Sequence, residues 1–204
     1  MKQKMQQWLV RPQGKLGPLG LVVLLVTASL VTPLSLDMYT PAVPHMTEAF
    51  GTTAGTVNLT LVGYFLFFAV GLLVFGPLSD RYGRRPVLLA GVVTYTSASG
   101  LCALALDIEM LIAFRVVQAL GAGAVSAVAI AVVKDAFKAE KREAILSIVQ
   151  VMFVVGPVLS PVVGALILQV FDWRMTFCAL GAVGVFCCAL AVLFEETLPQ
   201  EERY

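Results

Sequence analysis

The sequence predicts an all-α membrane protein with six transmembrane helices, from its composition and from the placement of its charges. Of the 204 residues, 59% are apolar and only 13% are charged. With the 17 glycines, about two thirds of the chain is apolar, against about 45–50% in soluble domains. A spanning helix takes about 20 residues, so the apolar residues suffice for six spans. This composition excludes a soluble domain, a disordered chain and a nucleic-acid-binding protein with a basic face.

Charged residues divide the chain into six apolar runs, which we interpret as spanning helices over residues 16–40, 55–77, 86–106, 108–133, 144–168 and 174–194. The first run has no charge from Leu16 to Leu36. A secretory signal is the competing interpretation, but its apolar core would be only about 7–15 residues long and followed by a small-residue cleavage site. This run is longer and has no A-x-A sequence, which favours a retained helix.

The placement of lysine and arginine predicts the orientation of the chain. With the N-terminus inside, twelve of the fourteen basic residues fall in inner segments, and only Arg174 falls in an outer loop. Basic residues favour the cytoplasmic side, so both termini are predicted to be cytoplasmic. The expected organisation is a cytoplasmic segment 1–15, a six-helix transmembrane domain 16–194 and the start of a cytoplasmic linker 195–204. The loops are too short to hold a soluble domain, so the helices must carry the function.

Two ionisable residues lie inside predicted spans, Asp37 in the first and Arg115 in the fourth. A charge within the bilayer costs about 2.5–3.5 kcal/mol even on the lenient insertion scale, and it marks a candidate functional site. Both are expected in the outer half of the membrane, which predicts a water-lined polar site where Asp37 pairs with Arg115 and gains and loses a proton. Gln118 lies one turn from Arg115 and is expected to hydrogen-bond there. Two alternatives stay open: a static ion pair that fixes helix packing, and an Asp37 that ends a shorter first helix.

The loop between the second and third spans contains the run Gly76-Pro77-Leu78-Ser79-Asp80-Arg81-Tyr82-Gly83-Arg84-Arg85-Pro86. Gly83 permits the tight turn that a very short loop needs. Asp80 is expected to cap a helix or to pair with a cation. Arg81, Arg84 and Arg85 are expected to hold the loop on the inner side.

Small residues recur every four positions on two spans, at Ala119, Gly123 and Ala127 and again at Gly156, Ser160 and Gly164. Such stripes let helices approach closely. Pro157 and Pro161 remove backbone donors and are expected to bend the fifth span. Tight packing explains both stripes, and a bend beside a small face also suits a helix contact that moves.

Together these motifs resemble the major facilitator superfamily. The run from Gly76 to Pro86 resembles its signature between helices 2 and 3, Leu111 to Gly123 resembles its helix 4 motif, and Gly156-Pro157 with Gly164 resembles its helix 5 antiporter motif. Leu36 to Pro44 and Glu195 to Pro199 narrow the resemblance to the bacterial drug:proton antiporters of the bicyclomycin and chloramphenicol resistance branch. The resemblance covers residues 18–199.

This resemblance implies the N-terminal six-helix half of the family's fold, which is an inverted pair of three-helix repeats. It implies proton-coupled export of small drug-like compounds by alternating access, in the bacterial inner membrane, with the proton as coupling ion and no cofactor. Asp37 matches the family's helix 1 acidic residue, and Arg115 its helix 4 arginine. Ser160 and Pro161 depart from the helix 5 motif, which usually has two glycines there.

Alternating access needs two six-helix halves, and this chain supplies one. We expect the second half in a C-terminal portion beyond this sequence, in a separate chain or in a copy of this chain, and we favour an incomplete copy of a twelve-helix exporter. The alternative is a truncated or remnant six-helix protein without transport of its own. An enzyme is not expected, because an intramembrane serine protease would need a membrane histidine and the only histidine, His45, falls in a loop.

Tyr39, Tyr64, Gln150 and Phe153 are candidates for lining a substrate cavity, although packing explains each of them equally well. The four cysteines fall inside spans and are interpreted as packing residues. One histidine without a cysteine or acidic cluster predicts no metal site. The expected partners are a small drug-like molecule, the lipid bilayer and the second six-helix half, and no nucleic acid.

Overall fold

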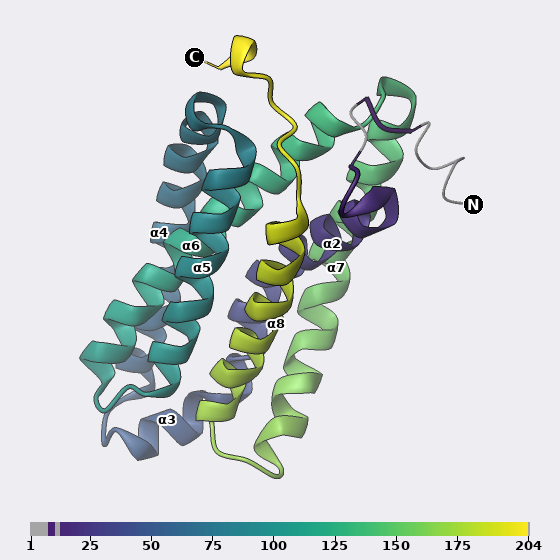
Figure 1. The fold of residues 1–204 in the computed structure, drawn as a ribbon. Helices are drawn as coiled ribbons and strands as arrows, with labels where there is room; N and C mark the ends of the chain where they lie inside the picture. Colours follow the sequence, from purple (N-terminus) through teal and green to yellow (C-terminus); the bar gives the residue numbers. More distant parts are fainter. Residues whose placement is uncertain (1–7, 11–12, 204) are drawn as a thin grey trace.

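The computed structural model describes residues 8–10 and 13–203, which form a bundle of helices (Figure 1). Six helices within these residues are long and apolar enough to cross a membrane, which confirms the predicted fold class. They are α2 (Gly17–Asp37), α4 (Ala54–Tyr82), α5 (Arg84–Ala103), α6 (Ile108–Ala136), α7 (Ala139–Leu168) and α8 (Arg174–Leu193). The short elements are η1 (Thr40–Ala42), α3 (Val43–Ala49) and η2 (Gln200–Glu202). Of the predicted N-terminal segment 1–15, residues 1–7 and 11–12 lie outside the described residues.

The helices extend further than the predicted spans where charged residues flank them. α4 continues to Tyr82 although the predicted span ended at residue 77, and α7 begins at Ala139 rather than at residue 144. The prediction ended each span at the first charges. A helix of 29 or 30 residues rises about 43–45 Å, more than the ~30 Å of bilayer hydrocarbon. Its terminal turns therefore lie among headgroups and water, where charges are tolerated. The remaining helix ends lie within three residues of the prediction.

The first predicted span, residues 16–40, is not one continuous helix up to its C-terminal end. α2 ends at Asp37, and η1 and α3 follow, each with a proline in its first turn. Pro41 has no N–H to donate to the Asp37 carbonyl, which favours the end of the helix at this point. The alternative in which Asp37 ends a shorter first helix is therefore the one that the structure shows.

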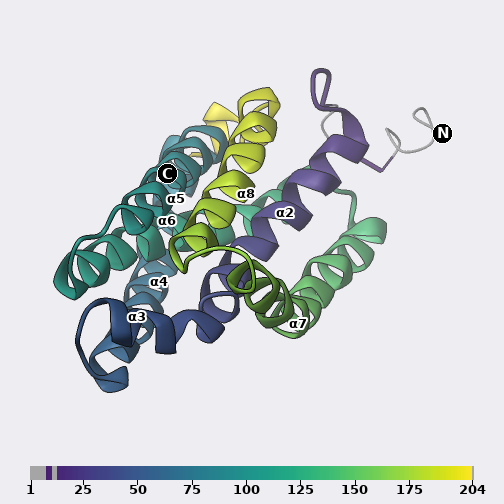
Figure 2. The ribbon, with the colours of Figure 1, turned by 90° about the horizontal axis from the view of Figure 1, so that it is seen from below.

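The helices pack in one continuous arrangement, which Figure 2 shows from the end at which α3 lies. α6 packs on both α4 and α5, α8 packs on α5, and α2 contacts α6, α7 and α8. We call this end the α3 end. The opposite end, where α2 begins and α8 ends, is called the basic end, because it carries Arg81, Arg84, Arg85, Lys134 and Lys138.

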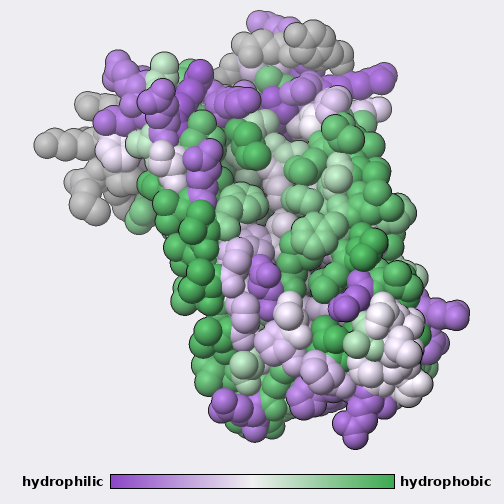
Figure 3. All heavy atoms as spheres, turned by 180° about the vertical axis from the view of Figure 1, so that it is seen from behind, coloured by the Kyte–Doolittle hydropathy of each residue, from purple (hydrophilic) through white to green (hydrophobic). Residues whose placement is uncertain are grey.

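The surface separates by polarity along the bundle (Figure 3). Hydrophilic residues gather at the basic end and at the α3 end, with a mostly hydrophobic band between them. On the face shown, hydrophilic residues also extend into the band on the side of the α3 end. The band matches a bilayer, and its polar interruption lies in the half of the bundle nearer the α3 end.

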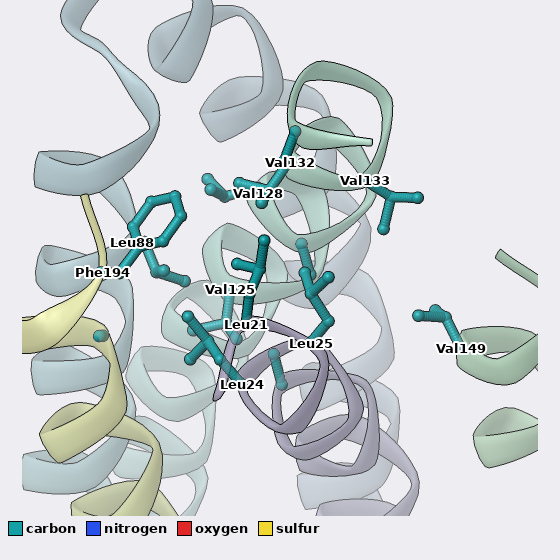
Figure 4. Close-up of a cluster of buried hydrophobic side chains, with 14 of the residues drawn as sticks. Leu21, Leu24, Leu25, Leu88, Val125, Val128, Val132, Val133, Val149 and Phe194 are labelled. Atoms are coloured by element: carbon teal, nitrogen blue, oxygen red, sulfur yellow. The ribbon is translucent and has the colours of Figure 1, made fainter. Parts of the chain in front are cut away.

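Two clusters of buried apolar side chains fill the interior. The cluster towards the basic end is mainly aliphatic and includes Leu21, Leu24, Leu25, Leu88, Val125, Val128, Val132, Val133, Val149 and Phe194 (Figure 4). The cluster towards the α3 end is rich in aromatic residues, including Tyr39, Tyr64, Tyr95, Trp173 and Phe177. Tyrosine combines an apolar ring with a polar tip, so the second cluster can accommodate buried polar groups.

The small-residue stripes lie where helices approach one another closely. A Cβ atom at Gly123 would overlap the backbone of Phe68 and Gly71 in α4, and one at Gly164 would overlap the Met38 carbonyl at the end of α2. Gly156 lies against the Pro33 side chain. The stripe of α7 therefore packs along the last turns of α2, next to Asp37, as small-residue contacts between membrane helices do.

Candidate functional site

Arg115 of α6 is fully buried in the half of the bundle nearer the α3 end. Small residues around it let α6 pack tightly between α4 and α5, so its guanidinium is enclosed by protein. Among the described residues, no acidic side chain lies within salt-bridge distance of Arg115. A buried charge without an opposite charge is costly, so other groups must stabilise it.

Three aromatic rings surround the Arg115 guanidinium, from the bend after α2, from α4 and from α8. Its central carbon lies 4.4 Å from the ring centre of Tyr64, 4.8 Å from that of Tyr39 and 5.8 Å from that of Phe177. Each ring face attracts a cation, by about 0.5–2 kcal/mol. We call these three rings the aromatic cage of Arg115.

An amide and a hydroxyl complete the surroundings of Arg115. Its Nη1 donates to the Gln118 Oε1 at 2.9 Å, and the Gln118 Nε2 donates to the Ser99 Oγ at 2.7 Å. The predicted hydrogen bond within α6 is confirmed, and Ser99 extends it to α5. In the described part of the chain, Arg115 Nε and Nη2 and the Tyr64 hydroxyl are buried without hydrogen-bond partners.

The predicted pairing of Asp37 with Arg115 is wrong for this structure. Asp37 is half-buried at the last residue of α2, and within residues 8–10 and 13–203 it has no salt bridge to Arg115. Instead, Tyr39, two residues further on, contacts the guanidinium through its ring. The Tyr39 hydroxyl is anchored on α4 by Thr60 Oγ1 at 2.6 Å, which holds the ring in place.

The four candidate cavity residues separate into two pairs. Tyr39 and Tyr64 are fully buried against Arg115. Gln150 and Phe153 are exposed on α7, which buries only a narrow stripe of small and aliphatic residues. The two tyrosines thus belong to the Arg115 site. The exposed pair lies on a face that is free to meet lipid, substrate or a second half.

The loop motif at the basic end forms a second polar cluster. Gly83 has a φ of +103°, a backbone conformation that glycine adopts without strain, and it alone joins α4 to α5. Arg84 is buried and bonds to Asp80, to Ser79 Oγ at 2.6 Å and to Asp135 Oδ2 of α6 at 2.7 Å. The expectation that Asp80 pairs with a cation is confirmed.

The other motif residues lie around this cluster. Arg85 donates to the Val192 carbonyl of α8 at 2.9 Å, whereas Arg81 is exposed and stacks on Tyr82. Gly76 lines a cleft together with Asp80, Arg84, Lys134 and Asp135. The motif therefore connects α4, α5, α6 and α8 at the basic end.

Glu196 caps the first turn of α5. Its carboxylate accepts hydrogen bonds from the backbone N–H of Arg84 at 2.9 Å and of Arg85 at 3.2 Å. It also accepts from the backbone of Thr197 and Leu198, and it lies 3.6 Å from Arg203 Nη2. A carboxylate at a helix N-terminus satisfies free N–H groups and the helix dipole, so Glu196 fixes the segment after α8 to the loop motif.

We predict that Glu196→Gln lowers the stability of the chain by about 1–3 kcal/mol, because the charge-assisted bonds to the α5 N-terminus are lost. Thermal unfolding of the purified chain in detergent, followed by circular dichroism, measures this. Glu201→Gln is the matched control, since Glu201 is exposed in the same segment. Equal midpoints for the two variants would contradict the capping role.

The segment before α2 also reaches the end of α8. Gln13 is buried, and its side chain donates to the Glu195 carbonyl at 3.1 Å and accepts from the Glu195 backbone N–H at 2.9 Å. Nearby, one backbone hydrogen bond of Val10 and another of Lys138 connect this segment to the turn between α6 and α7. The segment before α2 and the segment after α8 thus both hold the basic end together.

Sequence reasoning missed several residues of both clusters. Phe177 and Ser99 contribute to the Arg115 site, and Asp135 joins the loop motif. Asp135 had a signal, since it is an acidic residue just after the fourth predicted span, at the same end of the bundle as the basic loop motif. Phe177 had none, because one aromatic residue in an apolar span resembles any other. No group of three or more metal-ligating side chains occurs in the described part of the chain.

Comparison with known proteins places these features in a family. Residues 25–203 match the family model of the Major Facilitator Superfamily. The chain is 41% identical over 174 residues to the chloramphenicol resistance protein of Pseudomonas aeruginosa, covering 85% of this chain and 42% of that protein. It is 32% identical over 171 residues to the multidrug resistance protein MdtL of Citrobacter koseri, covering 83% of this chain and 44% of that protein.

A solved structure agrees in fold. The xylose transporter XylE from E. coli, in an inward open conformation, superposes with a TM-score of 0.76 at 16% identity, over 88% of this chain and 48% of that one. At this identity the likeness concerns the fold alone. The chain spans less than half the length of the curated relatives named above.

Proposed function

Because the chain belongs to the Major Facilitator Superfamily, we propose that it forms one half of a proton-coupled exporter of small drug-like compounds. The second six-helix half belongs to the same polypeptide or to a separate one. The two halves alternate access to a site between them, as in the rocking mechanism of this architecture. The basic end faces the cytoplasm, because basic residues favour that side, and the membrane is the bacterial inner membrane.

The observation that carries the proposal is the buried charge of Arg115 together with a half-buried Asp37 carboxylate that forms no salt bridge with it. Ionisable residues inside membrane helices mark ion and proton pathways. Asp37 ends α2 next to the small stripe of α7, so a shift between these helices changes its surroundings. A carboxylate there binds a proton in one state and releases it in the other. The relative named for chloramphenicol resistance supports a small antibiotic as the exported compound.

The test is antibiotic accumulation in bacteria. We define the paired exporter as this chain expressed with the part of the P. aeruginosa chloramphenicol resistance protein that follows the matched region. Cells with the paired exporter are expected to accumulate less chloramphenicol than cells with either part alone, and an uncoupler is expected to abolish the difference. Equal accumulation in all three strains, with both parts present in the membrane, would contradict the proposal and favour a six-helix protein without transport.

A further inference from the structure

Arg115 is charged and buried, yet the groups facing it are aromatic rings, weakly acidic side chains and the Gln118 amide. The titratable side chains near its guanidinium are Tyr39, Tyr64, Tyr95 and Cys102, and among the described residues no carboxylate joins them. Two of its nitrogen atoms, Nε and Nη2, have no hydrogen-bond partner there. The guanidinium therefore retains unused capacity for a carboxylate.

The ring of Tyr39 lies where a carboxylate was expected. Asp37 and Tyr39 are separated by one residue, and only Tyr39 contacts Arg115. Its hydroxyl is held on α4 by Thr60, and Tyr64 and Phe177 enclose the guanidinium from α4 and α8. Three separate elements thus hold the aromatic cage, so the cage is fixed independently of Asp37.

We propose that Tyr39, Tyr64 and Phe177 are positioning residues that take the place of a carboxylate beside Arg115 and thereby keep Asp37 unpaired. This inference rests on the proposed function, in which Asp37 exchanges the proton. Ring faces stabilise a cation without binding it as tightly as a carboxylate does. Removal of a ring leaves Arg115 short of stabilisation, so Arg115 and Asp37 form the ion pair that the cage prevents. Asp37 is then no longer free for the proton.

The direct test is nuclear magnetic resonance of the chain in lipid nanodiscs, with ¹⁵N-labelled arginine. The Arg115 Nε–H signal, assigned by its loss in Arg115→Lys, is expected upfield of the other arginines because of the ring currents of the cage. Tyr64→Phe keeps the ring and removes a hydroxyl that has no hydrogen-bond partner among the described residues, so the signal is expected to stay in place. Tyr64→Leu is expected to move it downfield, towards the position of a carboxylate-bonded guanidinium.

Two further variants make the result specific. Phe68 stacks on Tyr64 at 6.4 Å but is not one of the rings over Arg115, so Phe68→Leu is expected to leave the Arg115 signal unchanged. Loss of the Tyr64 ring current alone moves the signal downfield, and this part is expected to remain in the double variant Tyr64→Leu with Asp37→Asn. The further downfield movement that comes from a paired carboxylate is expected to disappear, because Asp37→Asn leaves no carboxylate to pair. An unshifted Arg115 signal in the unaltered chain, or a downfield movement of equal size in Tyr64→Leu and in the double variant, would overturn the proposal.

A transport measurement separates this inference from the proposed function. In the paired exporter, Tyr64→Leu is expected to slow chloramphenicol export about tenfold, equivalent to about 1.4 kcal/mol. Tyr64→Phe is expected to export at the rate of the unaltered chain. Equal rates in the Leu and Phe variants would count against the cage. An inactive exporter with the unaltered chain would count against the proposed function alone, since the resonance experiment still decides the cage.

Discussion

Asp37→Asn in the paired exporter is expected to reduce uncoupler-sensitive chloramphenicol export to the level of cells without the exporter. Asparagine has nearly the same shape, but its amide does not take up or release a proton in the physiological range. Asp37 is half-buried at the end of α2 and forms no salt bridge within the described residues, so packing and membrane insertion are expected to remain intact. Drug accumulation in energised cells, with membrane content measured by immunoblot, gives the result.

Glu48→Gln provides the control for this substitution. Glu48 is an exposed acidic residue in α3, at the same end of the bundle. Its neutralisation is expected to leave export unchanged. Normal export by Asp37→Asn would exclude Asp37 as the proton carrier and leave it the role of a helix end.

Arg115→Lys is expected to lower export by at least about tenfold. Lysine keeps the charge but lacks the planar group that lies against two ring faces while it donates to Gln118. A hydrogen bond to a charged group contributes about 1.5–3 kcal/mol, and about 1.4 kcal/mol corresponds to a tenfold change. The initial rate of export in cells measures the effect.

Arg174→Lys is the matched control for Arg115→Lys. Arg174 also stacks on an aromatic ring, that of Trp173 at 4.4 Å, but it is partly exposed and pairs with Asp172. Its replacement is expected to change export less than twofold, within the small range of surface ion pairs. Equal rates for both lysine variants would mean that Arg115 is a packing residue.

Local features of the chain could be predicted from the sequence. The Arg115–Gln118 bond follows from helical spacing, and the turn at Gly83 follows from the tight turn that a very short loop needs. The small stripes predicted close helix contacts, which the structure places on α2 and α4. The bond and the turn depend on residues that are near one another in the chain. The close contacts depend on stripes of small residues, which are typical of tightly packed membrane helices.

The partners of Arg115 could not be predicted in the same way. Depth in the membrane placed Asp37 and Arg115 at similar levels, but depth says nothing about rotation around the helix axis. The end of α2 turns Tyr39 rather than Asp37 towards α6, because Pro41 ends the helix and the Tyr39 hydroxyl is held by Thr60. Glu196 lies in an irregular segment after α8, and no periodicity predicts where such a residue will bind.

The most direct test of the account is a simultaneous measurement of proton and drug movement. The paired exporter is reconstituted in liposomes that contain a pH-sensitive dye, and a pH gradient is imposed across the membrane. We predict that chloramphenicol moves against the proton flux, and that Asp37→Asn stops both movements together. Drug movement without proton movement, or proton-linked transport that persists in Asp37→Asn, would contradict it.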